Sequence, residues 1–296
     1  EIVVFDDASG DESWRVLQDF RDRFPELIRI YRAEENGGNV FKAWRNACEK
    51  ASGDLIWLVE SDDYADPRFL ANLVPHFRDQ SVMLAFGRVR TLQSQGSYRD
   101  LIRVWVRDFF RMPSFKVVKM PAKKWFETAF SVRNLIPNVG GCVFRAGTIA
   151  AEDWEVASGF KVFGDWFLYS RIASAGQIVF NPGAVAFFRI HDTNQSGRGA
   201  QRSAWYFDEY QLLLNHLAKQ WPLPQYTRQK SFEEVKKLHA STAPNFVLER
   251  AQWDRFLTGG GIVRSHVLIG MLSLNVGGAE TAAIHIANEL VRLGCR

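Results

Sequence analysis

A hydrophobic run that ends abruptly in acids constrains the fold of this chain more than any other feature. The run covers residues 55–59, and Glu60, Asp62 and Asp63 follow it directly. An unbroken hydrophobic run of this length after a Ser-Gly pair predicts a central strand of a parallel sheet, covered on both faces. Open α/β sheets bind ligands beyond the carboxyl ends of their strands, which is where the three carboxylates fall.

These three carboxylates predict a divalent cation site. Residues two apart in an extended chain share a face, so we expect Glu60 and Asp62 to point at one ion while Asp63 turns away. Hard oxygen ligands this close together suit Mg²⁺ or Mn²⁺ carrying a phosphate. The alternative is that the acids only start the next helix. Since Asp66 and Pro67 already supply an N-cap and a first helical residue, metal binding is the preferred interpretation.

The composition of the chain narrows the classes of protein to which it can belong. The 296 residues are 47% hydrophobic and 24% charged, as in ordinary globular proteins, and the net charge of +4 is far short of a nucleic-acid-binding signature. Three widely spaced cysteines indicate neither a zinc site nor a disulfide framework, which favours a cytoplasmic location. No hydrophobic run is long enough to span a membrane. Because the chain begins inside a strand and ends inside an apparent helix, we expect a fragment of a longer protein.

A second hydrophobic run, residues 2–5, also ends in acids, Asp6 and Asp7. Ser9 and Glu12 then have the spacing of a capping box, which predicts that a helix begins there. This stretch is therefore expected to be a strand, an acidic turn and a helix.

Strands and helices continue to alternate. The pattern predicts a strand over residues 27–31, a loop over 36–39 and an amphipathic helix over 40–51. A helix over 67–78 and a strand over 83–86 follow. This alternation indicates an α/β protein with right-handed parallel crossovers.

These acids and loops resemble a known family. A strand ending in two Asp residues, an Asn-Gly loop, an Arg-Asn pair and a DxD-type acid cluster are similar, in order and spacing, to family 2 glycosyltransferases of the GT-A fold. The residues that carry the resemblance are Asp6, Asp7, Ser9, Asp11, Asn36, Arg45, Asn46, Glu60, Asp62 and Asp63. Two features depart from the family: Glu60 replaces the first Asp of the cluster, and the usual first strand is missing. The resemblance implies a Rossmann-like, mostly parallel sheet flanked by helices.

The resemblance also implies roles for these residues. Asp6 and Asp7, with Ser9 beside them, would hold the uracil or ribose of a UDP-sugar, and Asn36 and Arg45 would lie near the nucleotide. The acid cluster would hold Mn²⁺ or Mg²⁺, which stabilises charge on the departing diphosphate as a Lewis acid. The alternative for Asp6 and Asp7 is an ordinary turn or helix cap.

A later segment, residues 163–171, is similar to the catalytic segment of the same family. Asp165 matches its catalytic Asp, Trp166 is assigned to the sugar site, and Gly164 replaces the usual Glu. An inverting transfer needs one carboxylate to take the proton from the acceptor hydroxyl, and Asp165 would be that base. The alternative is that Asp165 only caps a helix.

Two further segments extend the resemblance. Asn138, Gly140 and Gly141 precede a strand predicted over residues 142–145, and the family places this loop at the acceptor and donor-sugar site. His191 follows another predicted strand, and the family places it near the donor diphosphate or metal. A purely structural His191 is an equally good interpretation.

Four arginines recur at every fourth residue: Arg99, Arg103, Arg107 and Arg111. On a helix they would form a basic stripe beside a hydrophobic face. The simpler interpretation is a solvated helix face. The other is a surface for anionic lipid headgroups or a lipid-linked acceptor, which would add peripheral membrane contact to the cytoplasmic location.

The chain divides into three predicted segments. Residues 1–198 would be the GT-A domain without its first strand, and residues 199–261 a helical connector with a Gly-rich linker. The connector is expected to contain helices over 203–220 and 231–257. Residues 262–296 resemble the first strand and helix of family 4 glycosyltransferases of the GT-B fold, on a Gly-Gly-Ala-Glu turn.

Together these features predict a hexosyl-type, inverting, metal-dependent glycosyltransferase of cell-envelope polysaccharide biosynthesis. It would move sugar from a UDP-linked donor to a hydroxyl of a glycan or lipid-linked glycan, without any nucleic-acid partner. Two alternatives stay open. Pyrophosphate release would indicate a nucleotidyltransferase, and UDP binding that Mn²⁺ does not strengthen would indicate a non-catalytic glycan-binding module.

Overall fold

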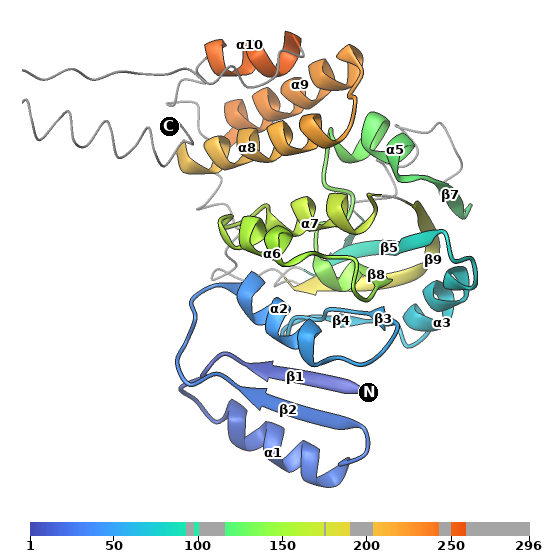
Figure 1. Ribbon diagram of the computed structural model, residues 1–296, viewed down its shortest axis with the longest axis vertical. Coiled ribbons are helices and arrows are strands. Elements are labelled where there is room, and N and C mark those ends of the chain that lie inside the picture. Colours follow the sequence, from blue (N-terminus) through green and yellow to red (C-terminus); the bar gives the residue numbers. More distant parts are fainter. Residues whose placement is uncertain (93–97, 101–115, 175, 190–203, 243–249, 259–296) are drawn as a thin grey trace, which may run out of the picture.

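The computed structural model shows an α/β protein in which helices cover a central sheet (Figure 1). The structure describes residues 1–92, 98–100, 116–174, 176–189, 204–242 and 250–258. Within these residues the strands form a two-stranded and a seven-stranded sheet. The predicted α/β class is therefore confirmed.

The two-stranded sheet lies at one end of the molecule (Figure 1). Strand β1 (Ile2–Asp6) pairs in parallel with β2 (Ile28–Arg32), and helix α1 (Ser13–Arg23) connects them. Helix α2 (Val40–Lys50) follows and packs against β1. The Asn39 side chain caps α2, because its Oδ1 accepts from the backbone N–H groups of the second and third helical residues. The predicted strand–helix alternation is confirmed here.

The predicted capping box before α1 is wrong. The Ser9 hydroxyl donates to Asp6 Oδ1, and Glu12 at the N-cap makes no capping hydrogen bond with its side chain. Asp11 Oδ1 instead accepts from Ser13 N at 2.9 Å. Ser9 therefore stabilises the acidic turn by its hydrogen bonds to Asp6. The three-residue spacing between Ser9 and Glu12 does not indicate this contact.

The seven-stranded sheet has the order β3, β8, β5, β9, β4, with β6 beside β5 and β7 beside β9. Among its described pairs, β5 and β9 run parallel and the others antiparallel. The strands are β3 (Leu55–Ile56), β4 (Tyr64–Ala65), β5 (Val82–Leu92), β6 (Tyr98–Asp100), β7 (Val118–Pro121), β8 (Cys142–Arg145) and β9 (Gln177–Arg189).

The prediction for residues 55–59 is wrong in two respects. Strand β3 has only two residues and lies at one end of this strand order, antiparallel to β8. Trp57 then leaves the ladder: its Nε1 donates to Gly140 O at 2.9 Å, and its ring stacks on Phe69 at 5.2 Å. A hydrophobic run shows that side chains are covered, but it does not show whether strands or loops cover them.

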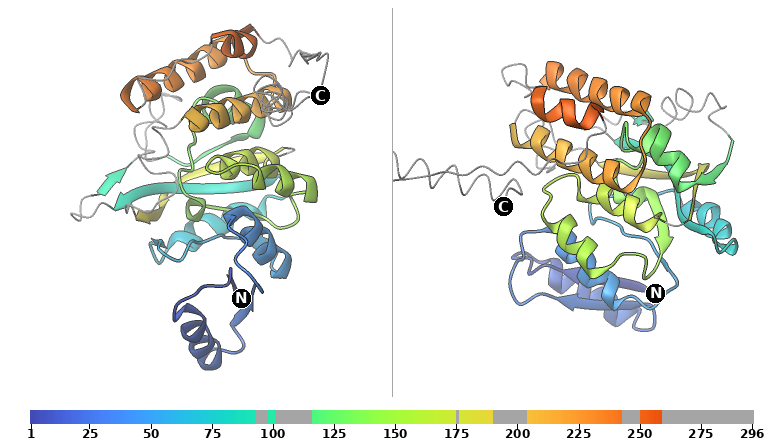
Figure 2. Two further views of the ribbon diagram at one scale, coloured as in Figure 1. Left: turned by 90° about the vertical axis from the view of Figure 1, so that its left-hand side faces the viewer. Right: turned by 45° about the horizontal axis from the view of Figure 1, so that its top comes forward.

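The helices lie on both sides of this sheet and beyond it (Figures 1 and 2). Helix α3 and the 3₁₀ helix η1 pack on β9 and β5, whereas α6 and α7 pack together and α7 contacts α8. The remaining helices are α3 (Phe69–Leu73), η1 (Val74–Arg78), α5 (Ala122–Trp125), η2 (Phe126–Phe130), η3 (Val139–Gly141), α6 (Ala151–Ser158), α7 (Gly164–Ile172), α8 (Ala204–Gln220), α9 (Gln225–Thr242) and α10 (Arg250–Thr258).

The core is centred on β5 and β9. Leu84 and Phe86 of β5 and Phe180 of β9 have no exposed surface. The Phe86 ring lies 5.2 Å from that of Phe180 and 5.4 Å from that of Trp125. Burial of such large rings supplies much of the stabilisation of a fold, so these two strands form its framework.

The C-terminal helices agree in part with the prediction. Helix α8 is confirmed, whereas the single helix expected over 231–257 is represented by α9 and α10.

Arg99 lies in strand β6, so the predicted basic helix is wrong at that residue. The other three arginines of the stripe, His191 and residues 262–296 lie outside the described residues. In the part of the chain that is described, every helix is too short or too polar to cross a membrane.

Candidate active site

The Asn138 side chain binds the acidic turn that follows β3, residues 60–63. Asn138 Nδ2 donates to Glu60 Oε2 at 3.0 Å and to Asp63 Oδ2 at 2.6 Å. The turn itself is held by Asp63 N, which donates to Glu60 O at 3.1 Å. Glu60 and Asp63 therefore converge, whereas extended geometry predicted that Glu60 and Asp62 would. The expectation that Asp63 turns away is wrong, because residues 60–63 form a turn. Asp62 is close enough for its charge to raise the pKa of Glu60, and its convergence with Glu60 on one ion stays a prediction.

Strand β9 ends at the same place. Asp63 Oδ1 accepts a hydrogen bond from the backbone N–H of Arg189 at 2.9 Å. Asp63 thus joins three segments that are far apart in the sequence: its own turn, the Asn138 loop and the last residue of β9.

Asp165 lies in the first turn of α7. Its Oδ1 accepts from Trp166 N at 2.6 Å, and its Oδ2 accepts from Asn134 Nδ2 at 3.3 Å and Tyr169 Oη at 3.5 Å. The N-cap position belongs to Phe163, so Asp165 is not the helix cap. Burial raises the pKa of Asp165 to about 7, although the three hydrogen bonds oppose this shift.

The carboxylates of the turn and Asp165 interact electrostatically. Burial, followed by the negative charges of Asp63, Asp62 and Asp165 in that order, raises the pKa of Glu60 to about 7. Burial is also the main cause that raises the pKa of Asp63. Like charges this close repel one another, so a cation at this position would stabilise the ionised forms.

The donor set fits a divalent cation in its chemistry. Glu60 and Asp63 offer the hard oxygen ligands that Mg²⁺ and Mn²⁺ prefer, and these two residues would hold such an ion. In the described part of the chain, no three His, Cys, Asp or Glu side chains are arranged to ligate one ion. Asn138 Nδ2 contacts both carboxylates instead. Oxygen atoms of a diphosphate or of water would have to complete the coordination.

Three glycines around the site are required by close packing. A Cβ on Gly140 would lie 2.8 Å from Asn138 Oδ1, and one on Gly141 would lie 2.5 Å from Val89 Cγ2. A Cβ on Gly164 would lie 2.5 Å from Cζ of Phe41, whose ring comes from α2. The Phe41 ring therefore leaves no room for a side chain at position 164, where the family of the resemblance has Glu.

Trp166 has a structural position. Its side chain is buried, and its Nε1 donates to Phe130 O at 2.7 Å. The ring packs beside Phe163 and Tyr210. The expectation that Trp166 faces a sugar is therefore wrong for this conformation, because its hydrophobic ring fills the core.

The residues predicted to hold the nucleotide form two interacting loops. Both carboxylate oxygens of Asp7 accept from Gly37 N at 3.1 Å, and Asn36 Nδ2 donates to Asp7 O at 2.8 Å. The turn after β1 and the Asn-Gly loop are therefore in contact, as expected if they form one site.

Asp6 and Arg45 are engaged in other contacts. Asp6 is buried, accepts from both Ser9 N and Ser9 Oγ, and lies 3.0 Å from Arg32 Nε as an ion pair. The Arg45 guanidinium donates to Glu49 at 2.8 Å on its own helix and to Glu155 of α6 at 2.6 Å. These side chains support the loops and the contact between helices α2 and α6.

The sequence did not single out Asn134, Tyr169 or Arg189. Tyr169 is four residues after Asp165, so helical spacing could have indicated that the two meet. Asn134 and the Arg189 backbone have no such local signal, since each reaches the site through tertiary packing.

The fold and the site define a class. The chain has the GT-A type of α/β fold, with a helical C-terminal region, and the model of Glycosyl transferase family 2 matches residues 1–138. This match includes the acidic turns and Asn138, whereas Asp165 lies beyond it. The first 138 residues are thus similar to family 2 glycosyltransferases.

Particular relatives agree with this class. An uncharacterized protein of Mycobacterium tuberculosis is 26% identical over 195 residues, which are 64% of this chain and 50% of that protein. The poly(ribitol-phosphate) beta-glucosyltransferase of Bacillus spizizenii is 25% identical over 154 residues, 52% of this chain and 23% of that enzyme. This chain spans about half the length of the mycobacterial relative.

A solved structure shares the fold. The crystal structure of S. aureus TarS residues 1–349 in complex with UDP-GlcNAc superposes with a TM-score of 0.54 and 16% identity. The superposition covers 87% of this chain and 70% of that one. At this identity the similarity concerns the fold.

Proposed function

We propose that this chain is an inverting family 2 glycosyltransferase that moves a sugar from a UDP-sugar to a hydroxyl of an acceptor glycan, assisted by Mn²⁺ or Mg²⁺. One observation carries the proposal. Asp165 has a pKa raised to about 7 and interacts with Glu60, next to Asp63, in a protein whose first 138 residues match the family. A carboxylate with a pKa near the working pH is well suited to act as a general base.

The proton transfer at Asp165 follows from its contacts. As the acceptor oxygen attacks the anomeric carbon, Asp165 takes the hydroxyl proton, the bond between the sugar and the diphosphate breaks, and UDP leaves. Hydrogen bonds from Asn134 and Tyr169 orient the carboxylate. Glu60 and Asp63 would hold the cation, which supplies Lewis-acid stabilisation of the leaving diphosphate.

The loops at Asp7 and Asn36 are proposed to hold the nucleoside. They contact each other, and both lie beyond the carboxyl ends of β1 and β2, where α/β sheets bind ligands. Asp6, Ser9 and Arg45 would act indirectly by supporting these loops and α2.

The acceptor is proposed to be an anionic polyol-phosphate polymer or a lipid-linked glycan of the cell envelope. The support comes from the relatives named for poly(ribitol-phosphate) glycosyl transfer. A cytoplasmic location with peripheral contact to a membrane surface is also part of this proposal.

The test measures UDP release from a panel of UDP-sugars, with and without Mn²⁺ and acceptor, by wild-type protein and by Asp165→Asn. Asp153→Asn is a matched control, because Asp153 also lies in the first turn of a helix but pairs with Arg171. We expect acceptor-dependent UDP release that only Asp165→Asn abolishes. Pyrophosphate release would instead indicate a nucleotidyltransferase. Sugar or UDP binding without turnover would indicate a binding module.

A further inference from the structure

Helix α8 of the C-terminal helical region packs against α7, the helix that carries Asp165 (Figure 1). Both helices lie beyond the residues that the family model matches. Asp165 is in the first turn of α7, and the side chains of Phe163 before it and Trp166 after it are buried. The position of the Asp165 carboxylate therefore depends on the contacts that hold this first turn.

The Glu209 carboxylate of α8 binds the backbone just before α7. Its Oε1 accepts from Lys161 N at 2.6 Å, and its Oε2 accepts from Val162 N at 2.8 Å and from Phe163 N at 3.3 Å. Phe163 is the N-cap of α7. A negative charge is favourable near the N-terminal end of a helix, and hydrogen bonds to a carboxylate are stronger than neutral ones. Glu209 therefore fixes the course of the loop that leads into α7.

Aromatic side chains of α8 hold the same turn. The ring centre of Phe163 lies 4.8 Å from that of Tyr206 and 4.9 Å from that of Tyr210. The ring of Tyr210 also lies 5.5 Å from that of Trp166. All four rings are buried, and closely packed rings leave little room for movement. The residues on both sides of Asp165 are therefore packed against α8.

The segment that carries Asn134, a hydrogen-bond donor to Asp165, is held by the next helix of the same region. Ser231 Oγ of α9 donates to Ser131 O at 2.7 Å, three residues before Asn134. Both serines are fully buried. Helices α8 and α9 thus contact the segments that carry the proposed base and one of its hydrogen-bond donors.

We propose that Glu209 is a positioning residue for the transfer: it holds the loop before α7 so that the Asp165 carboxylate faces the acceptor hydroxyl. The C-terminal helical region is then part of the catalytic unit. This inference rests on the proposed function, in which Asp165 is the base. Glu209 acts through the loop and the first turn of α7. A general base must lie within hydrogen-bond reach of the hydroxyl, so a small displacement of this turn slows the proton transfer.

The experiment compares Glu209→Ala with Gln220→Ala in steady-state kinetics of UDP release. Gln220, the last residue of α8, makes three hydrogen bonds to Ser170 and Arg171 near the other end of α7. Glu209→Ala should lower kcat about tenfold and change the donor KM by less than about twofold, because the nucleoside loops belong to other elements. Gln220→Ala is the matched control, since it removes contacts between the same two helices, and it should leave kcat unchanged.

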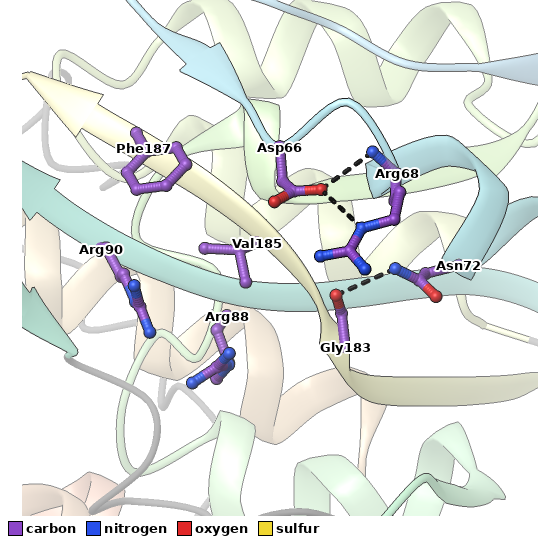
Figure 3. Close-up of a pocket in the computed structure, with 8 residues that line it drawn as sticks. All are labelled: Asp66, Arg68, Asn72, Arg88, Arg90, Gly183, Val185 and Phe187. Atoms are coloured by element: carbon purple, nitrogen blue, oxygen red, sulfur yellow. Dashed lines mark hydrogen bonds and ion pairs between the residues drawn. The ribbon is translucent and has the colours of Figure 1, made fainter.

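Two further variants separate positioning from stability. Glu209→Gln keeps the shape of the side chain and one acceptor oxygen, so it should regain part of the kcat that Glu209→Ala loses. Asn72→Ala removes the hydrogen bond from Asn72 Nδ2 to Gly183 O at 2.9 Å, in the lining of a cavity beside α3 (Figure 3). This contact joins α3 to β9, so its loss should lower Tm without lowering kcat. Tm is measured for every variant, and kcat is measured well below it.

Amide hydrogen exchange tests the contact itself without catalysis. The N–H groups of residues 161–163 should exchange faster in Glu209→Ala than in wild type, because they lose their acceptor. In Gln220→Ala they should exchange at the wild-type rate.

Three results would overturn the positioning role. One is an equal loss of kcat in Glu209→Ala and Gln220→Ala, and another is a donor KM that rises as much as kcat falls. The third is unchanged exchange in Glu209→Ala. If the wild-type protein releases no UDP, the proposed transferase function is wrong, and the exchange rates alone decide whether Glu209 holds the loop.

Discussion

The predicted site residues lie in two regions that are packed very differently. In the unit formed by β1, α1 and β2, helix α1 has no buried residue, and Val16 and Phe20 are more than 40% exposed. In the seven-stranded sheet, Leu84, Phe86 and Phe180 are fully buried. The acids of the second region are therefore positioned by a close-packed framework, whereas those of the first depend on local contacts.

The acids of the two regions also differ in their electrostatic surroundings. Asp6 and Asp7 accept hydrogen bonds from Ser9 and Gly37, and Asp6 also pairs with Arg32. Burial raises the pKa values of both Glu60 and Asp165, and neighbouring carboxylates also raise that of Glu60. The comparison teaches that the acids of the first region, where the proposed nucleoside loops lie, are paired with nearby groups of the same region. In the second region the ionised carboxylates repel one another, and protonation or a bound cation would reduce this repulsion.

The largest expected effect concerns Asp165. Replacing it with Asn keeps the shape but removes the base, so kcat should fall about 10³-fold with little change in donor binding. Asp7→Asn in the other region should mainly raise the KM for the donor. Steady-state kinetics of UDP release would check both. An equal loss of kcat in the two variants would contradict the different roles expected for the two regions.

The next effect concerns Gly164. An added methyl group would meet the Phe41 ring at 2.5 Å and Ala157 O at 2.8 Å, so Gly164→Ala should destabilise the fold by about 1 to 3 kcal/mol. Thermal unfolding would measure this, and adding Phe41→Leu should restore part of the loss. Gly10→Ala is the control in the exposed region, because a Cβ there meets nothing within 4 Å. A large effect at Gly10 would contradict the packing contrast.

A smaller effect is expected from pH. The pKa of Glu60 rises from 4.5 to about 7, and that of Asp165 rises from 3.8 to about 7. The folded state then binds more protons than the unfolded state between about pH 4 and 7. The free energy of unfolding should therefore fall as pH rises through this window. Tm measured from pH 4.5 to 8 should decline by several degrees.

Two variants sharpen the pH test. Glu60→Gln/Asp165→Asn should flatten the decline in Tm, whereas Glu152→Gln, an exposed acid in the first turn of α6, should not. Mn²⁺ should raise the Tm of wild type above pH 7, where the carboxylates are ionised. If Tm still declines with pH in the double variant, other titratable side chains cause the decline.

The smallest effect is expected in the exposed unit. Val16 is 42% exposed, so Val16→Ala should change the free energy of unfolding by less than about 0.5 kcal/mol. Val89→Ala is the matched substitution in the buried sheet, where Val89 has no exposed surface, and it should cost about 2 kcal/mol. Urea unfolding would compare them. Similar costs at both positions would show that the two regions are equally well packed.

The sequence by itself determined the elements whose patterns are local. Hydrophobic runs and helical periodicity predicted β1, β2, α2 and α8, because each pattern reflects which side chains one element buries. The acids at the ends of two runs indicated where to look for a site, since the carboxyl ends of strands in such sheets face the ligand.

Only the tertiary structure decided which acids act together. Glu60 pairs with Asp63 through Asn138, which is 75 residues from Asp63, and Asp165 reaches them on a separate helix. Burial raises the pKa values of Glu60 and Asp165, and the neighbouring acids also raise that of Glu60. The Phe41 ring against Gly164 also joins distant segments. Local sequence patterns carry no information about such contacts, because the packing of the whole chain sets them.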